Sequence, residues 1–138
     1  MDPQRYGSMR LSPPASRYAV IEAFAIHGLV PPQDYVEFLI ATNGADGALT
    51  PSIYLSLWRL EDIFSSNELY AVEEFAPGLL LFGSDGGGTA FAFDLTDEWI
   101  VVEIPFVPLF REEMSKIAST FSGFLDALRS KDRGRAAD

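Results

Sequence analysis

Apolar residues recur at helical spacing near the beginning of the chain. Between residues 16 and 28, and again between residues 31 and 44, they fall three and four positions apart, which predicts two helices. The first begins after a capping serine and ends at a glycine, and its helical spacing is set by Tyr18, Ile21 and Phe24-Ala25. The second opens with two prolines, and its wide apolar stripe predicts a well-buried helix.

The same spacing returns near the end of the chain. Apolar residues between positions 114 and 128 fall on one helical stripe that includes Ile117 and Phe121. Two glutamates precede the stripe, and Arg129 and Lys131 follow it, which suits the dipole of a helix. We therefore predict one long C-terminal helix.

The middle of the chain has the spacing of strands. Residues 53–57 and 90–94 alternate between larger apolar and smaller or polar side chains, whereas residues 79–82 and 99–104 form continuous apolar or β-branched runs. These four segments are predicted strands. Asp46-Gly47 predicts a turn, and the pattern of residues 60–70 predicts short helical turns.

Helices at both ends and strands in the middle indicate the α+β class. We predict a single domain with N-terminal helices, a central, mainly antiparallel sheet and a C-terminal helix packed on that sheet. The length of 138 residues also suits one domain, which we place at residues 15–129. Residues 1–14 and 130–138 lack an apolar stripe, so we expect a flexible N-terminal segment and a flexible C-terminal tail.

A glycine-rich turn joins two of the predicted strands and contains Gly83, Asp85, Gly86, Gly87 and Gly88. Glycines tolerate positive φ and the close approach of another backbone, so a structural hairpin turn is the first interpretation. The alternative is a cradle for a small anion or nucleotide. No lysine follows the glycines and a strand rather than a helix comes next, so neither phosphate-binding pattern is met.

Composition restricts where the protein works and what it binds. The absence of cysteine excludes disulfides and thiolate metal sites and fits the cytoplasm. No apolar run approaches the roughly 20 residues that span a membrane, and the first ten residues lack a signal-peptide core. A net charge of −10 argues against nucleic acid as a partner.

The sequence gives no support for catalysis. Its single histidine, His27, sits where the first helix should end, and the paired acids are adjacent residues whose side chains point apart. No pattern of metal ligands or cofactor-binding residues is present. We therefore expect a protein that is not an enzyme and has no cofactor, no metal and no catalytic residues.

Acidic residues are unevenly distributed. Residues 60–110 contain ten aspartates and glutamates but no lysine or arginine. This stretch is either a solvated surface that keeps the protein soluble or a surface that steers a basic partner. The candidate partner-binding residues are its charges and nearby aromatic side chains: Glu61, Asp62, Glu68, Glu73, Glu74, Asp97, Glu98, Tyr54, Trp58 and Tyr70. Not all of them can share one face, and Trp58 and Trp99 have the alternative of a place in the core.

Four segments in order resemble the SUKH superfamily. Residues 30–39 with Asn43-Gly44 resemble its "L-P-x-D-Y-x-x-F-L…N-G" opening, with Val30 in place of the usual leucine and Pro32 in place of a polar residue. Residues 57–63 resemble "L-W-x-L-E-E-(I/L)", residues 82–88 resemble "(I/F)-G-x-D-G-G-G", and residues 117–125 resemble "I-A-x-S-F-x-x-F-L". The resemblance spans residues 16–128.

The resemblance implies binding rather than catalysis. The superfamily contains cell-wall-assembly regulators and bacterial immunity proteins, and it shares no catalytic constellation. An immunity-type protein would neutralise a toxin, often a nuclease, by direct contact, here through an acidic surface. The alternative is an intracellular scaffold or regulator that acts through homo- or hetero-oligomer contacts, and a homodimer is compatible with the sequence.

Overall fold

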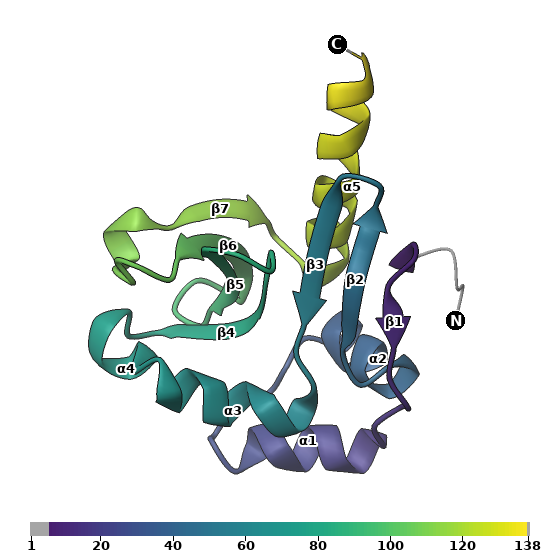
Figure 1. The fold of residues 1–138 in the computed structure, drawn as a ribbon. Coiled ribbons are helices and arrows are strands. Elements are labelled where there is room, and N and C mark those ends of the chain that lie inside the picture. The colour runs from purple at the N-terminus through teal and green to yellow at the C-terminus, as the bar shows by residue number, and fades with distance from the viewer. Residues whose placement is uncertain (1–5, 138) are drawn as a thin grey trace.

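The computed structural model describes the backbone of residues 6–137 and the side chains of residues 6–131. Within these residues, a seven-stranded antiparallel sheet has the strand order β1-β2-β3-β4-β5-β6-β7. Each strand therefore pairs with its neighbours in sequence. Helices α1 and α2 precede most of the sheet, and α5 follows it (Figure 1). The predicted α+β class and single-domain architecture are confirmed.

The element bounds are as follows. The strands are β1 (Arg10–Leu11), β2 (Ala45–Thr50), β3 (Ile53–Leu57), β4 (Leu79–Ser84), β5 (Thr89–Asp94), β6 (Ile100–Pro105) and β7 (Ser115–Ala118). The helices are α1 (Arg17–Ala25), α2 (Gln33–Ala41), α3 (Leu60–Leu69), α4 (Val72–Phe75) and α5 (Phe121–Ala137), with the 3₁₀ helix η2 (Arg111–Glu113) before β7.

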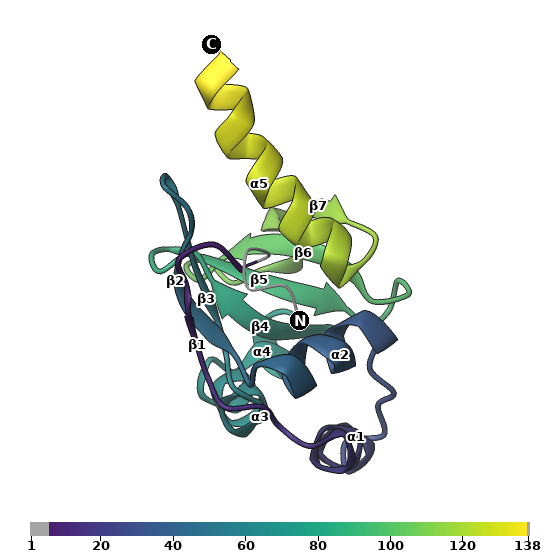
Figure 2. The same ribbon diagram turned by 90° about the vertical axis from the view of Figure 1, so that its right-hand side faces the viewer.

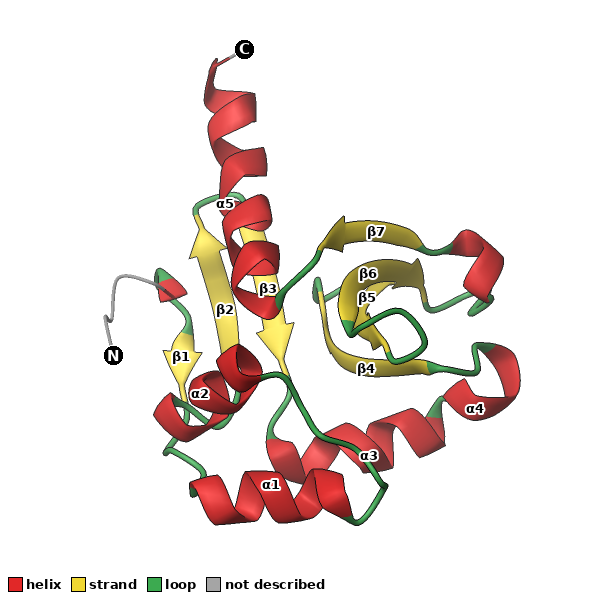
Figure 3. Cartoon of the chain, turned by 180° about the vertical axis from the view of Figure 1, so that it is seen from behind, coloured by secondary structure: helices red, strands yellow, loops and turns green. Residues whose placement is uncertain are grey.

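The sheet divides where β3 meets β4. The two strands pair through Ser56 with Ser84 and through Leu57 with Gly83. Beyond this junction β1–β3 form one limb, and β4–β7 curl into a separate layer (Figures 1 and 3). A side chain at Gly83 would collide with the backbone carbonyl oxygen of Ser56, so the junction requires glycine.

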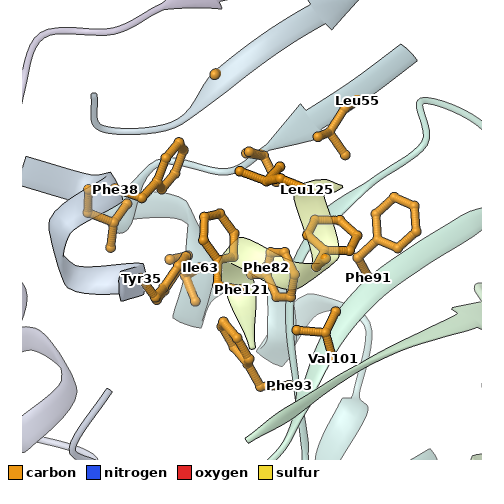
Figure 4. Close-up of a cluster of buried hydrophobic side chains, with 14 of the residues drawn as sticks. Tyr35, Phe38, Leu55, Ile63, Phe82, Phe91, Phe93, Val101, Phe121 and Leu125 are labelled. Carbon is orange, nitrogen blue, oxygen red and sulfur yellow. The ribbon is translucent and has the colours of Figure 1, made fainter. Parts of the chain in front are cut away.

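The main core lies between one face of the sheet and helices α1, α2 and α5. Alternation along β4 and β5 turns Phe82 and Phe93 to this face, where their ring centroids are 4.5 Å apart. The ring centroid of Tyr35 on α2 lies 4.9 Å from that of Phe93 and 5.1 Å from that of Phe121 on α5 (Figure 4). Aromatic side chains from two helices and two strands thus tie α2 and α5 to the curled layer.

The opposite face of β4–β6 carries a second, smaller core. Alternate residues such as Leu81, Ala92 and Val102 are fully buried there. Val72 of α4 and Leu109 of the β6–β7 connection cover them. Because both faces of these strands are covered, the strands read in sequence as nearly continuous apolar runs.

Both N-terminal helices form where they are predicted. The Oγ of Ser16 accepts a hydrogen bond from the amide of Ala19 at 3.1 Å. Of the apolar residues whose spacing predicts α1, Phe24 is buried, but Tyr18 and Ile21 are exposed, and Val20 is buried in their place. This helix is apolar on both sides, so residue spacing alone does not select the inner face.

Three other expectations about the middle and end of the chain need correction. Asp46-Gly47 lies inside β2, paired with β3, instead of forming a turn. Residues 60–69 form a single helix, α3. The predicted C-terminal helix is wrong over Ser115–Ala118, which form β7 on the edge of β6, and α5 begins at Phe121. Met114 and Ile117 fit a helical stripe, but the edge of β6 offers backbone hydrogen bonds that a helix would leave unused.

Regular structure and buried side chains also occur in residues 6–14, and regular structure in residues 130–137. Tyr6 and Met9 are buried, β1 pairs with β2, and the amide of Ser12 donates a hydrogen bond to Oγ1 of Thr42 at 2.8 Å. Helix α5 continues to Ala137, through most of the predicted tail. Residues 1–5 and 138 lie outside the described residues.

Candidate protein-binding surface

Exposed apolar side chains occur on α3–α4 and on the β6–β7 connection, and α4 and that connection lie on the same side of the molecule (Figures 1 and 3). Tyr70, Phe75 and Phe110 are 40–47% exposed, and Val107 is 88% exposed. Together with the half-buried Phe106, they make up what we call the aromatic face. Such clusters of exposed apolar side chains commonly mark sites of protein contact.

Ring contacts connect two residues of the aromatic face with each other and with Trp58. The ring of Tyr70 is 6.4 Å from that of Trp58 in a stacked arrangement and 5.0 Å from that of Phe106. Trp58 itself is half-buried and packs against both cores. Trp58 therefore positions Tyr70. Its packing fits the alternative of a core residue better than that of an exposed anchor.

The β6–β7 connection is held at both ends. The amide of Phe106 donates to the carbonyl oxygen of Gly88 at 2.9 Å. Further along, Nη2 of Arg111 lies 3.0 Å from Oδ2 of Asp94, and Nη1 donates to the carbonyl oxygen of Pro77 at 3.1 Å. These contacts fix the connection beside α4, so Val107 and Phe110 are displayed from an anchored segment.

Asp94 is the buried member of this anchor, with 2% of its surface exposed. Its Oδ1 accepts hydrogen bonds from the amide and the hydroxyl of Thr96 at 3.0 and 2.6 Å. Burial opposes ionisation of this carboxyl, but the hydrogen bonds from Arg111 and Thr96 outweigh it and lower the pKa of Asp94. Asp94 is therefore a charged structural residue rather than a proton donor at neutral pH.

Exposed acids are numerous on the elements that carry the aromatic face. The acidic rim consists of Glu68 on α3, Glu73 and Glu74 on α4, and Glu112 and Glu113 on η2. Asp97 and Glu98 lie in the neighbouring β5–β6 turn, which is tied to the end of α4 because the amide of Leu95 donates to the carbonyl oxygen of Gly78. Five of the predicted partner-binding acids therefore come from adjoining elements.

The other predicted partner-binding residues lie elsewhere. Glu61, at the start of α3, accepts a hydrogen bond from the side-chain amide of Asn43 at 2.7 Å, which lowers its pKa. Asp62 forms an ion pair with Arg59 at 3.1 Å. Tyr54 lies on the outer side of β3 and donates to Oδ1 of Asp46 at 2.8 Å.

Residues 60–110 contain no lysine or arginine, but two of their acids form ion pairs with arginines from outside this range. Arg59 and Arg111 stand just outside residues 60–110 and pair with Asp62 and Asp94 inside it. Eight of the ten acids have no ion pair among the described residues, so no neighbouring cation there neutralises their charges.

The glycine-rich turn is a structural hairpin. Oδ1 of Asp85 accepts hydrogen bonds from the amides of Gly87 and Thr89, and Oγ of Ser84 accepts one from the amide of Gly86. These amides are already bound within the turn, and Asp85 contributes a negative charge beside them. The arrangement gives no support to an anion cradle. Positive φ is confined to Gly86, at +82°, among Gly86–Gly88.

Sequence reasoning missed Phe75, Phe106, Val107, Phe110 and Arg111. A run of aromatic and proline residues at 105–110 was visible, but spacing alone does not tell whether such side chains face the core or solvent. Asp94 likewise looked like one more surface acid, and its burial depends on the distant Arg111.

The remaining chemistry of the described part of the chain is limited. No group of three histidine, aspartate or glutamate side chains converges there as metal ligands would. The ring of His27 stacks on Phe64 with centroids 3.9 Å apart. None of the helices in that part has both the length and the apolar character that crossing a bilayer demands.

Comparison with known proteins gives a family. The chain matches no curated protein. A family model described as SMI1 / KNR4 family (SUKH-1) matches residues 16–127, which run from the cap of α1 into α5. This range nearly coincides with that of the sequence resemblance and covers most of the chain. The chain therefore belongs to the SMI1 / KNR4 family (SUKH-1).

Proposed function

We propose that this chain is a non-enzymatic, cytoplasmic binding protein of the immunity type, which neutralises a basic toxin of the nuclease class by direct contact. The observation that carries the proposal is the aromatic face with its acidic rim. Apolar side chains supply short-range contacts, and the surrounding carboxylates supply complementarity to a basic protein.

The charge distribution suits a nuclease in particular. A nuclease binds phosphates through clustered lysines and arginines, and a surface of carboxylates can occupy the same positions. The exposed acids of this chain that form no ion pair would also accelerate its diffusional encounter with a basic nuclease by electrostatic steering. The acidic rim thus provides both the long-range attraction and a reason for inhibition.

The experiment is capture of the partner from the native host by the full chain, followed by identification of the captured protein and a growth assay in which the two proteins are co-expressed. Wild type should bind a basic toxin and restore growth. Phe110→Ser should reduce binding by about tenfold or more, because it removes an exposed aromatic anchor. The proposal fails if the captured protein is not toxic, or if Phe110→Ser protects as well as wild type.

Charge reversal on the rim gives a separate test with the identified partner. Glu74→Lys should slow association by up to about tenfold at low salt, and added salt should weaken the wild-type complex. Glu22→Lys on α1 changes the net charge by the same amount and serves as the control. Equal rates for the two variants would show that net charge alone matters and would remove the rim from the interface.

The alternative of a scaffold or regulator has one observation in its favour, the exposed apolar outer side of α1. Capture of a non-toxic host protein, with the complex stable in high salt, would favour this alternative. A toxin gene beside the gene for this chain would favour the immunity function.

A further inference from the structure

An open depression of about 520 Å³ lies where the two limbs of the sheet separate. Strands β3 and β4 are paired at two positions, and in Figure 2 β2 and β3 run across the direction of β4 and β5. The size of the depression falls within the range of about 300–1,000 Å³ that small-molecule sites occupy. Its lining contains no aliphatic side chain and no residue of the aromatic face: Asp46, Tyr54, Ser56, Ser84, Asp85, Gly86 and Gly87.

Two serine hydroxyls meet at this depression from neighbouring strands. Ser56 and Ser84 lie directly opposite each other across the β3–β4 junction, so their side chains share one face of the sheet. Oγ of Ser84 accepts a hydrogen bond from the amide of Gly86 at 3.2 Å. No acceptor for its own hydrogen occurs among the described residues. The hydroxyl of Ser84 is therefore available as a donor to a ligand.

Asp46 orients two further hydroxyls. It accepts hydrogen bonds from Nη2 of Arg10 and from the hydroxyl of Tyr54, each at 2.8 Å. The bond from Arg10 contributes most to lowering the pKa of Asp46, burial opposes it, and the bonds from Tyr54 and Ser56 add to it. Because Tyr54 and Ser56 direct their hydrogens to Asp46, their oxygens keep lone pairs that can accept from a ligand.

Asp85 adds a carboxylate oxygen, and Tyr54 adds a ring. Oδ1 of Asp85 is held by the amides of Gly87 and Thr89, whereas Oδ2 has no hydrogen bond or ion pair with any described residue. The ring of Tyr54 stands against the glycine-rich turn, since a Cβ on Gly86 would lie 2.6 Å from it, and Tyr54 is 46% exposed. The depression thus combines one free donor, several acceptors and an accessible aromatic ring.

This set of groups selects among classes of ligand. An anion would meet the charge of Asp85, and Arg10 is already paired with Asp46. An ammonium or guanidinium group can only donate, so it would leave the hydroxyl of Ser84 without an acceptor. A ligand hydroxyl both donates and accepts, so neighbouring hydroxyls match the whole set. The C–H groups of a sugar ring can also pack on the ring of Tyr54.

We propose that this depression binds a neutral polyhydroxylated ligand of the sugar class. Ser84 donates to one ligand hydroxyl, Oδ2 of Asp85 accepts from its neighbour, and the ring of Tyr54 covers the apolar side of the sugar. A free monosaccharide and a sugar unit of a polysaccharide offer the same chemistry. The site uses no residue of the aromatic face or the acidic rim, so it stands independently of the proposed immunity function.

Nuclear magnetic resonance titration of the isotope-labelled full chain tests the proposal. The probes are glucose, galactose, mannose and N-acetylglucosamine, each as the free sugar and as a short oligosaccharide. At least one should bind saturably with a dissociation constant of about 1–10 mM, and the amides that shift should belong to β3 and residues 84–88. Tighter binding of the oligosaccharide would indicate a polysaccharide as the source, and equal binding would indicate a free sugar.

Substitutions in the lining locate the site. Ser84→Ala and Ser56→Ala should each weaken sugar binding by about two- to tenfold, because each removes one hydrogen bond. Ser56→Ala leaves the hydrogen bonds of the glycine-rich turn intact and so separates ligand binding from turn structure. Tyr54→Ala should weaken binding by about tenfold or more through loss of the ring. Ser65→Ala, which removes an exposed hydroxyl on α3, is the matched control and should bind as wild type does.

Three results would overturn the proposal. The first is the absence of saturable shifts with every sugar up to about 50 mM, well above the expected dissociation constant. The second is wild-type affinity in both Ser84→Ala and Ser56→Ala, with circular dichroism showing that the variants are folded. The third is saturable binding of methylguanidine at these amides in place of any sugar, which would assign the depression to a cation.

Discussion

The ion pair of Asp94 and Arg111 should be the most sensitive polar contact in the structure. Asp94 is 2% exposed and the side chain of Arg111 is 30% exposed, so the pair is largely shielded from water. Arg111→Ala removes the contacts at 3.0 and 3.4 Å and leaves the carboxylate with only its two hydrogen bonds from Thr96. The variant therefore leaves the buried carboxylate of Asp94 without a counter-ion.

The cost can be estimated from this geometry. Removing one member of a fully buried ion pair costs about 3–5 kcal/mol, because the remaining charge is desolvated without compensation. The hydrogen bonds from Thr96 remain and Arg111 is partly exposed, so we expect the free energy of unfolding to fall by about 2–3 kcal/mol. Arg59→Ala is the control, since its pair with Asp62 is about half exposed and should contribute at most about 1 kcal/mol.

Urea unfolding followed by tryptophan fluorescence measures both costs, because Trp58 and Trp99 pack against the cores. The reasoning is refuted if Arg111→Ala costs no more than Arg59→Ala. The aromatic face offers a second readout, since the connection that Arg111 anchors carries Val107 and Phe110. Loss of partner binding in a variant that is still folded would indicate that the anchor also positions the surface.

The same pair predicts a dependence on pH. Because the pKa of Asp94 is lowered in the folded state, its contribution to stability is present above the unfolded pKa of about 3.9 and is lost as pH falls through the lower folded pKa. Without the guanidinium, burial of Asp94 is opposed only by the hydrogen bonds from Thr96, so we expect the pKa of Asp94 to be higher in the variant than in wild type. The difference in stability between wild type and Arg111→Ala should therefore be largest near neutral pH and shrink below about pH 4. A difference that does not change with pH would contradict this account.

Two further predictions concern the backbone around β4. Gly86→Ala should lower the free energy of unfolding by about 1–3 kcal/mol, because Gly86 has φ of +82° and a Cβ would lie 2.6 Å from the ring of Tyr54. Gly88→Ala should cost under about 0.5 kcal/mol because no heavy atom lies within 4 Å of the added Cβ, and equal melting temperatures for the two variants would contradict both values. Asn67→Ala should cost about 1–3 kcal/mol in urea unfolding, since its amide joins the backbone of α3 to that of β4 through three hydrogen bonds of 2.8 Å, and an unchanged urea midpoint would count against it.

Local signals in the sequence were sufficient where their physical cause is local. The hydroxyl of Ser16 caps α1 within three residues, and Gly28 has φ of +72° at the end of that helix. The alternation of Phe91 and Phe93 with alanines specified β5 because side chains of a strand alternate whatever the strand pairs with. The fold class followed from the order of such segments.

Partnerships between distant segments were decided only in the tertiary structure. Ser115–Ala118 became a strand because β6 offered an edge, and Asp46 and Gly47 became part of β2 because β3 lay opposite. In both segments the strand conformation depends on backbone hydrogen bonds to residues far away in sequence, so the local sequence pattern does not predict it.

The candidate surface shows the same division. The sequence by itself determined that residues 60–110 are acidic, because charge is a property of composition. Which acids lie on adjoining elements, which are neutralised and which apolar side chains they surround were decided by tertiary structure. Arg111 reaches Asp94 and thereby fixes the β6–β7 connection beside α4, while α1 turns Val20 rather than Tyr18 inward. Burial and charge pairing depend on neighbours in space. The sequence therefore determined which acidic and apolar side chains are present, and the packing of the sheet and helices determined which of them are exposed on the candidate surface.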